Sequence, residues 1–288
     1  MSMAMPEDDS LLAQFTWPLD AWVRGFSLRI TDAAGMPLAP LPLHHFNVVN
    51  YDRRELMYPF VQRLMSFSKE TDAVALPATV GSPLTAGQHL GFYVMWRNES
   101  GRPMDGLYLT MTMRWMPMRR SASPMTVFPF HVDVHHVVLG YDTFDVPPGG
   151  CIQTAEFSVP TDGHLLAAGG HLHDHGVSLR LEDATTHAAL VVLMARRDAR
   201  GAVLGVSRKL LGVWTPGPHL RANRRYRLVV TYDNPTSDTA RAAMGILAGL
   251  FAPDDPSRWP AIDPANAEWQ LELARLGVGG AKHQSVLP

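Results

Sequence analysis

The sequence is almost without cysteine and carries little net charge. Cys151 is the only cysteine among 288 residues, which excludes an internal disulfide and any metal site that needs several thiolates. The formal net charge is −2 and the Lys and Arg residues are scattered, so we expect neither nucleic acid nor a membrane as a partner. No apolar run is long enough to cross a bilayer, and the first ten residues lack the basic and apolar stretches of a signal peptide. We therefore expect a cytoplasmic protein or, if the chain is a trimmed mature form, an extracytoplasmic one.

What the sequence does contain is typical of a β protein. Hydrophobic residues make up 46% of the chain and charged residues 18%, which indicates a globular rather than a disordered protein. Short runs rich in β-branched and aromatic residues recur between Gly, Pro, Asn and Asp, and each run predicts a strand. The predicted strands are Gly25–Thr31, Leu43–Asn50, His89–Asn98, Leu107–Trp115, Cys151–Val159, Val177–Glu182, Ala189–Ala195, Val203–Lys209, Arg225–Tyr232 and Met244–Phe251. The pattern indicates an all-β fold, and at this length we expect two tandem antiparallel β-sandwiches of the jelly-roll type with a short C-terminal helix.

Turn residues near the midpoint divide the predicted strands into two groups. The strongest turn signal there is Pro147–Gly150, with the sequence Pro-Pro-Gly-Gly. We therefore expect an N-terminal sandwich at residues 11–146, a C-terminal sandwich at residues 147–277 and a flexible tail at residues 278–288.

Two segments depart from the strand pattern. Asp52–Phe67 has a loosely helical spacing but contains a proline, so we expect a helical insertion or a long loop there. Pro264–Leu276 repeats apolar residues at helical spacing and predicts a helix, with Asp263 as its N-cap and Gly277 as its stop.

The most informative segment is Gly169–Gly176, which reads Gly-Gly-His-Leu-His-Asp-His-Gly. Side chains alternate faces along a strand, so we expect His171, His173 and His175 on one side. Imidazole is a common ligand for copper, zinc, iron and nickel, and two His residues two positions apart can bind one ion from a single strand. The segment therefore predicts a metal site; the alternative is a polar, solvated strand end or loop.

Further His and Met residues are candidate ligands. They are His44, His45, His131, His135, His136, His164 and Met244. His44 and His45 are adjacent, so both can reach one ion only where a bulge or twist interrupts the strand. A thioether beside two imidazoles selects copper, above all Cu(I), over zinc or magnesium. Because the chain has fifteen Met residues, donor chemistry alone does not single out Met244.

Five short motifs follow one another in an order that is shared with a known family. They are Leu43-His44-His45, Asp142-Thr143-Phe144-Asp145-Val146-Pro147-Pro148-Gly149, Gly163-His164-Leu165-Leu166, His171-Leu172-His173, and Thr236-Ser237-Asp238 followed by Met244. In their order and approximate spacing, from about Phe15 to Phe251, the chain resembles the copper type II, ascorbate-dependent monooxygenases. This is the family of peptidylglycine α-hydroxylating monooxygenase and dopamine β-monooxygenase. Its fold is two tandem jelly rolls, which agrees with the strand pattern.

The resemblance implies a protein with two copper ions. It implies that His171, His173 and Met244 hold a copper at which O2 is activated and hydrogen is abstracted from a C–H bond. It also implies a second copper near His44 and His45 that supplies an electron. The implied partners are a small-molecule reductant of the ascorbate type and a small-molecule or peptide substrate.

The sequence departs from the family at the first copper site. Where the family has a third His ligand, this chain has Met95, which would act as a softer ligand. Alternatively, His131, His135 or His136 completes the site, or the site is degraded. The disulfides of the family are also absent, and His175 has a counterpart there that is not a ligand.

Three functions stay open on the sequence alone. The first is a copper-dependent monooxygenase that hydroxylates an aliphatic C–H bond. The second is a non-catalytic copper protein for delivery, storage or sensing that keeps the site at His171, His173 and Met244. The third is a β-sandwich interaction module whose His residues are structural or bind zinc incidentally. No nucleophile elbow, P-loop or dinucleotide-binding motif points to another enzyme class.

Overall fold

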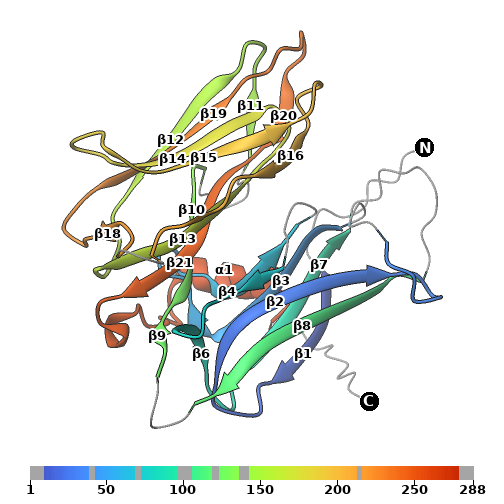
Figure 1. Ribbon diagram of the computed structural model, residues 1–288, viewed down its shortest axis with the longest axis vertical. Coiled ribbons are helices and arrows are strands. Elements are labelled where there is room, and N and C mark those ends of the chain that lie inside the picture. Colours follow the sequence, from blue (N-terminus) through green and yellow to red (C-terminus); the bar gives the residue numbers. More distant parts are fainter. Residues whose placement is uncertain are drawn as a thin grey trace. The chain divides into compact units, whose positions relative to one another are not determined.

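The protein is built mostly from strands. The structure is a computed structural model that describes residues 10–38, 43–68, 73–96, 106–118, 123–135, 143–212 and 216–278. Within these residues one α-helix occurs, α1 (Ala267–Arg275), together with one 3-10 turn, η1 (Pro256–Arg258) (Figure 1). The prediction of an all-β chain with one short C-terminal helix is confirmed. No helix in this described part of the chain is long and apolar enough to span a membrane.

The chain divides into two compact units, and neither is continuous in sequence. Unit 1 comprises residues 1–55, 59–127 and 261–288, and unit 2 comprises residues 56–58 and 128–260. This division corrects the expected boundary at residue 147, because residues 128–133 pair with a strand near the end of unit 2. Pro147–Gly150 is a turn, with Gly149 and Gly150 at positive φ, but it lies inside unit 2.

The described residues of unit 1 form two sheets. In the first, the strands are ordered β1 (Ser10–Thr16), β7 (His89–Trp96), β3 (Leu43–Arg54) and β4 (Val61–Phe67). In the second, the order is β5 (Val74–Ala75), β2 (Ala21–Thr31), β6 (Val80–Leu84) and β9 (Met125–Thr126), with β8 (Tyr108–Pro117) also paired to β2. Among the described residues every pair in this unit is antiparallel except β6 with β9, which is parallel.

The larger hydrophobic core of unit 1 takes side chains from both of its sheets. Strand β2 contributes Val23 and Ile30, while β3 contributes Phe46 and Val48 and β7 contributes Leu90. Because alternate residues of a strand point to one face, the residues between them are left on the opposite, outward face of each sheet.

Helix α1 packs on a smaller hydrophobic cluster of unit 1. The buried members of this cluster are Val49, Val61, Tyr93, Trp269 and Leu276. Two polar contacts fix the helix: the Tyr93 hydroxyl donates to the Leu276 carbonyl at 2.8 Å, and Arg63 donates to the Glu272 carboxylate at 2.9 Å. The helix therefore belongs with the N-terminal strands, although it follows the strands of unit 2 in sequence.

In unit 2 the part of the chain that the structure describes forms two large sheets and a two-stranded pair. One sheet has the order β10 (Phe128–Asp133), β21 (Gly245–Pro253), β13 (Gly163–Leu172) and β17 (Lys209–Leu210), with β18 (His219–Leu220) also paired to β13. The other has the order β12 (Cys151–Phe157), β19 (Tyr226–Tyr232), β14 (Gly176–Asp183), β15 (Ala189–Arg197) and β16 (Val203–Val206). The pair is β11 (Phe144–Val146) with β20 (Ala240–Ala243).

The core of unit 2 also takes side chains from both of its large sheets. Leu165, Ala168 and Leu172 come from β13, while Leu179 and Leu228 come from the other sheet. Strands β13 and β21 lie side by side for their whole length (Figure 1). The residues of β13 that alternate with its core side chains are therefore on the outward face of this sheet.

The segment Asp52–Phe67 needs correction, because it is neither a helix nor a long loop. It contains the end of β3, a short turn and β4. Strand β4 pairs with β3 and buries Leu64, Met65 and Phe67 in the core of unit 1. Pairing and burial in the sheet outweigh the weak helical spacing of this segment.

The start of the C-terminal helix also differs from the prediction. The helix begins at Ala267 rather than Pro264, because the side chain of Asn266, not that of Asp263, accepts hydrogen bonds from the first free N–H groups. Gly277 follows the helix with φ +68°, so the predicted stop is confirmed. Residues 279–288 of the expected tail lie outside the described residues.

We predict that Trp269→Ala destabilises the protein by about 3–5 kcal/mol, because it empties the cluster beneath α1. Arg275→Ala, an exposed change on the same helix, should alter the free energy of unfolding by less than about 0.5 kcal/mol. Denaturant titration followed by tryptophan fluorescence and circular dichroism measures both values. Equal effects of the two substitutions would contradict the packing of the helix described above.

Candidate metal centres

His171 is the last but one residue of β13, and His173 is the first residue after the strand. Leu172 between them is buried in the core of unit 2, so the two imidazoles point the other way. Their ring centroids are 4.9 Å apart and the rings are nearly perpendicular, at 87°. The two rings of the HxH pair therefore lie close together.

Met244 is brought to His173 by the pairing of β13 with β21. The last paired residues are Leu172 and Gly245. His173 follows Leu172 and Met244 precedes Gly245, so these two residues are next to each other beyond the end of the ladder. The Tyr232 hydroxyl joins these two residues, because it accepts a hydrogen bond from the His173 N–H at 3.0 Å and donates one to the Met244 carbonyl at 2.5 Å. The backbone of both predicted ligands is therefore held by one side chain.

Tyr232 is suited to this role because it is buried, with only 3% of its surface exposed. Burial raises the pKa of its hydroxyl well above the usual range. The group consequently stays protonated and can donate to the Met244 carbonyl throughout the neutral pH range.

His175 does not continue the row formed by His171 and His173. Strand β13 ends at Leu172, and His175 lies in the following turn with φ +71°. Its N–H donates to the Gly201 carbonyl at 2.8 Å, and its carbonyl accepts from the Asp233 N–H at 2.9 Å. The prediction that His175 lies on the same side of a strand as His171 and His173 is therefore wrong, because the backbone turns after the end of β13.

In unit 1, a β-bulge brings His44 and His45 to the same face of β3. Leu43 pairs with Trp96 and His45 pairs with Met95, so His44 is an extra residue in the ladder. Leu43 is buried in the core, and the rings of His44 and His45 lie 4.1 Å apart at 77°. This is the bulge that two adjacent His residues need if both are to reach one ion.

Met95 lies directly opposite His45 across the β3–β7 pair. Side chains in such antiparallel pairs have Cβ atoms about 4.5–5.5 Å apart. The two imidazoles and the thioether predicted for the first copper site therefore belong to adjacent backbone positions within unit 1.

The other His candidates belong to unit 2. His131 lies on β10 between buried core residues, opposite Ala248 of β21, and its ring is 5.1 Å from that of Tyr58. His135 is exposed and its ring is 5.9 Å from that of Phe144. His136 lies outside the described residues.

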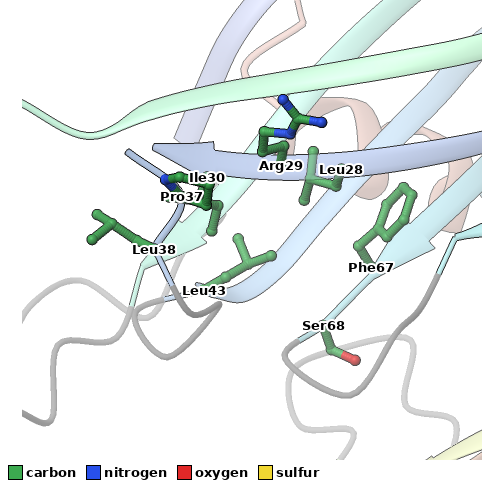
Figure 2. A pocket seen from close by; sticks show the side chains of 8 residues that line it. All are labelled: Leu28, Arg29, Ile30, Pro37, Leu38, Leu43, Phe67 and Ser68. Carbon is green, nitrogen blue, oxygen red and sulfur yellow. The ribbon is translucent and has the colours of Figure 1, made fainter. Parts of the chain in front are cut away.

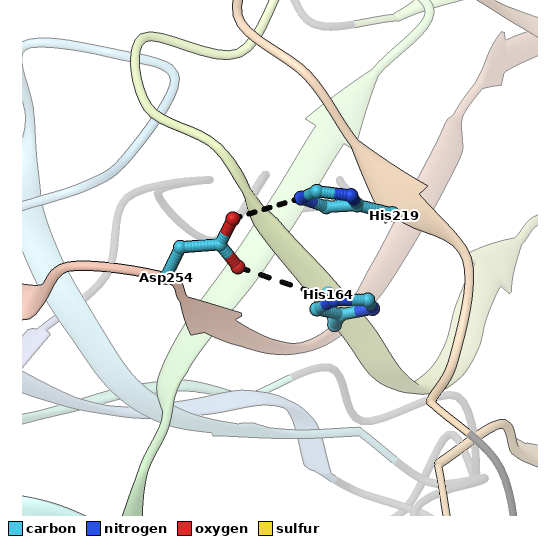
Figure 3. Close-up of side chains that lie close together, drawn as sticks. All are labelled: His164, His219 and Asp254. Atoms are coloured by element: carbon cyan, nitrogen blue, oxygen red, sulfur yellow. Dashed lines mark hydrogen bonds and ion pairs between the residues drawn. The ribbon is translucent and has the colours of Figure 1, made fainter.

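A further cluster was not predicted from the sequence as a set. His164, His219 and Asp254 come together at the opposite end of β13 from His171, and Figure 3 shows the carboxylate beside both imidazoles. His164 was singled out in the sequence, but its two partners follow it by 55 and 90 positions and share no motif with it.

A pocket in unit 1 offers no metal site. It is lined by Leu28, Arg29, Ile30, Pro37, Leu38, Leu43, Phe67 and Ser68 (Figure 2). Apart from Arg29 and Ser68 these side chains are apolar, and the predicted copper ligands are not among the lining residues that the structure describes.

Comparison with known proteins adds little to this geometry. No family model and no curated protein matches the sequence. Among solved structures, the chain is similar to the major capsid protein P2 from bacteriophage PM2, with 12% identity, 86% of this chain and 96% of that chain covered, and a TM-score of 0.41. It is also similar to the STIV MCP, with 10% identity, 90% and 99% covered, and a TM-score of 0.40. Likeness at this level carries no argument about function.

We predict that Tyr232→Phe lowers the free energy of unfolding by about 1–3 kcal/mol, because the His173 N–H and the Met244 carbonyl lose their common partner. The same substitution should weaken Cu(I) binding at the HxH site, measured by competition with a Cu(I) chelator. Tyr226→Phe is the matched control: Tyr226 is also a buried tyrosine of β19, but its hydroxyl contacts Arg221 instead. A loss of Cu(I) affinity that is equal in both variants would contradict the positioning role of Tyr232.

Proposed function

We propose that this protein binds copper in both units and acts as a copper-dependent monooxygenase on two tandem jelly-roll sandwiches. The observation that carries the proposal is the junction of His173 with Met244 through the Tyr232 hydroxyl. This contact brings together His173 of the HxH pair and the thioether residue Met244, which are 71 positions apart in sequence. Two imidazoles and a thioether form a donor set that suits copper, and Cu(I) in particular.

In this proposal His171, His173 and Met244 hold the copper of unit 2. When bound, copper supplies the one-electron chemistry with O2 by which a C–H bond is hydroxylated. Three protein ligands leave a coordination position open for O2. Tyr232 sets the spacing of the ligands, and Leu172 anchors the strand between the two imidazoles in the core.

His44, His45 and Met95 hold the second copper in unit 1. The bulge at His44 supports this assignment because it places both imidazoles on one face, and the β3–β7 register places Met95 opposite His45. A small-molecule reductant of the ascorbate type would deliver electrons here, and a small molecule or peptide would be the substrate.

A non-catalytic copper protein for delivery, storage or sensing is the second candidate function. One observation favours it: the residue opposite His45 is Met95, so both proposed sites combine two His with a Met. Two sites with the same thioether-containing ligand set are suited to storing or transferring Cu(I), as well as to its redox cycling.

We predict two Cu(I) per chain after anaerobic reconstitution and one in the variant His44→Ala/His45→Ala. Elemental analysis of the dialysed protein measures the ratio. His89→Ala is the matched control, because His89 is an exposed histidine of unit 1 whose imidazole contacts the Asp52 carboxylate and which is not a proposed copper ligand, and it should leave two Cu(I) bound. A single copper in both the wild type and the double variant would show that His44 and His45 hold no metal.

We further predict that the copper-loaded protein forms an oxygenated product from labelled O2 with ascorbate. Met244→Ala should reduce product to background, because Cu(I) loses its thioether ligand, and His44→Ala should slow turnover by impairing electron supply. Met194→Ala is the control, since Met194 is exposed on β15 of the same unit.

The assay uses C-terminal-glycine peptides, phenylethylamines and small aliphatic compounds as substrates, with mass spectrometry of the product. O2 consumption alone is not a sufficient measurement, because an exposed copper ion with ascorbate also produces peroxide. Tight copper binding with no oxygenated product from the whole panel would favour the non-catalytic function over the monooxygenase.

A further inference from the structure

Three chain segments of unit 2 meet at the end of β13 that lies away from the HxH pair. His164 pairs with His219 across β13 and β18, and it pairs with Ala252 across β13 and β21. Asp254 follows the end of β21, and its N–H donates to the Asp162 carbonyl at 3.0 Å. The backbone of each of the three side chains is thus fixed by strand pairing or by a hydrogen bond beside it.

The three side chains present their donor atoms to one another. The imidazole rings of His164 and His219 are stacked, with centroids 4.3 Å apart and an angle of 8° between the rings. One Asp254 oxygen lies 2.9 Å from His219 Nε2, and the other lies 4.0 Å from His164 Nε2 (Figure 3). One nitrogen from each His and one carboxylate oxygen all lie within 4.8 Å of one another.

His164 is held in the tautomer that a metal ligand needs. Its Nδ1 lies 2.9 Å from the Gly217 carbonyl, which only accepts hydrogen bonds, so in the neutral ring Nδ1 carries the hydrogen and Nε2 keeps a free lone pair. Metal-ligating histidines commonly have this contact on the ring nitrogen that faces away from the ion. The close approach depends on glycine, because a Cβ at Gly217 would lie 2.0 Å from the Leu165 carbonyl oxygen.

A second β-bulge places His164 on the outward face. The register between β13 and β21 shifts between Leu165 and Ala167, which makes Leu166 an extra residue. Leu165 is fully buried in the core, so His164 before it points outward. The imidazole and carboxylate groups remain accessible, with 30%, 29% and 45% of the His164, His219 and Asp254 side chains exposed.

We propose that His164, His219 and Asp254 bind a zinc ion, at a site separate from the copper sites proposed above. Two imidazoles and one carboxylate suit Zn²⁺, and the absence of a thioether or thiolate from this set disfavours Cu(I). Three protein ligands leave a coordination position for water, which the exposure of the cluster permits. The ion joins β13, β18 and the residue after β21, so it stabilises the edge of this sheet.

The site can be tested by titrating the metal-free, full-length protein with Zn²⁺ in a calorimeter and counting zinc per chain after dialysis. We expect one zinc per chain, lost in His164→Ala and His219→Ala. Asp254→Asn preserves the shape of the side chain but removes its charge, and it should weaken binding more than the roughly 10–100-fold expected for loss of an outer contact. Circular dichroism confirms that each variant is folded.

Two control variants separate this site from others. His171→Ala/His173→Ala removes the proposed copper ligands of unit 2 and should leave the zinc bound, so the copper and zinc proposals can fail independently. His89→Ala removes a histidine that also contacts a carboxylate, Asp52, at 3.0 Å but belongs to no three-residue cluster in the described part of the chain. The proposal is wrong if the wild type binds no zinc. It is also wrong if all three cluster variants still bind zinc, or if His171→Ala/His173→Ala loses it.

Discussion

Strands β13 and β21 pair from Gly163–Pro253 to Leu172–Gly245, and both candidate sites of unit 2 lie at the ends of this ladder. At one end the ladder places Met244 beside His173, and at the other it places Asp254 beside His164. A slip of one residue in the register would turn the His side chains towards the core. The backbone hydrogen bonds of one strand pair, together with the burial of Leu165 and Leu172, therefore determine which donors meet.

Two β-bulges adjust the direction of the histidine side chains. In a regular strand the adjacent side chains of His44 and His45 would lie on opposite faces of β3, and the bulge at His44 removes this alternation. Without the extra residue at Leu166, His164 and His171, seven positions apart, would lie on opposite faces of β13. In both strands the core residues on either side of the bulge stay buried, so the bulge changes the face of the histidine without changing the core.

The sequence was a good guide where local pattern decides the structure. Runs of β-branched and aromatic residues predicted strands such as β3, β7 and β14, but they did not predict β13. His171 with His173 was recognisable because a two-residue spacing suffices to bring both rings together. The division into units was not predictable in this way, because the pairing of residues 128–133 with β21 joins segments that are far apart in sequence.

The cluster of His164, His219 and Asp254 was missed for the same reason: strand pairing, not spacing, brings its members together. Asp52–Phe67 was misread because burial in a sheet outweighed a weak helical pattern.

The β13–β21 ladder also has a kinetic consequence. Its paired residues are separated by 73 positions at Leu172–Gly245 and by 90 at Gly163–Pro253. Contacts between such distant segments require closure of a long loop, which makes their formation slow. An ion that needs ligands from both strands has no complete site in the unfolded chain. Such an ion adds an interaction that is missing until the ladder has formed, and it therefore acts by slowing unfolding more than by accelerating folding.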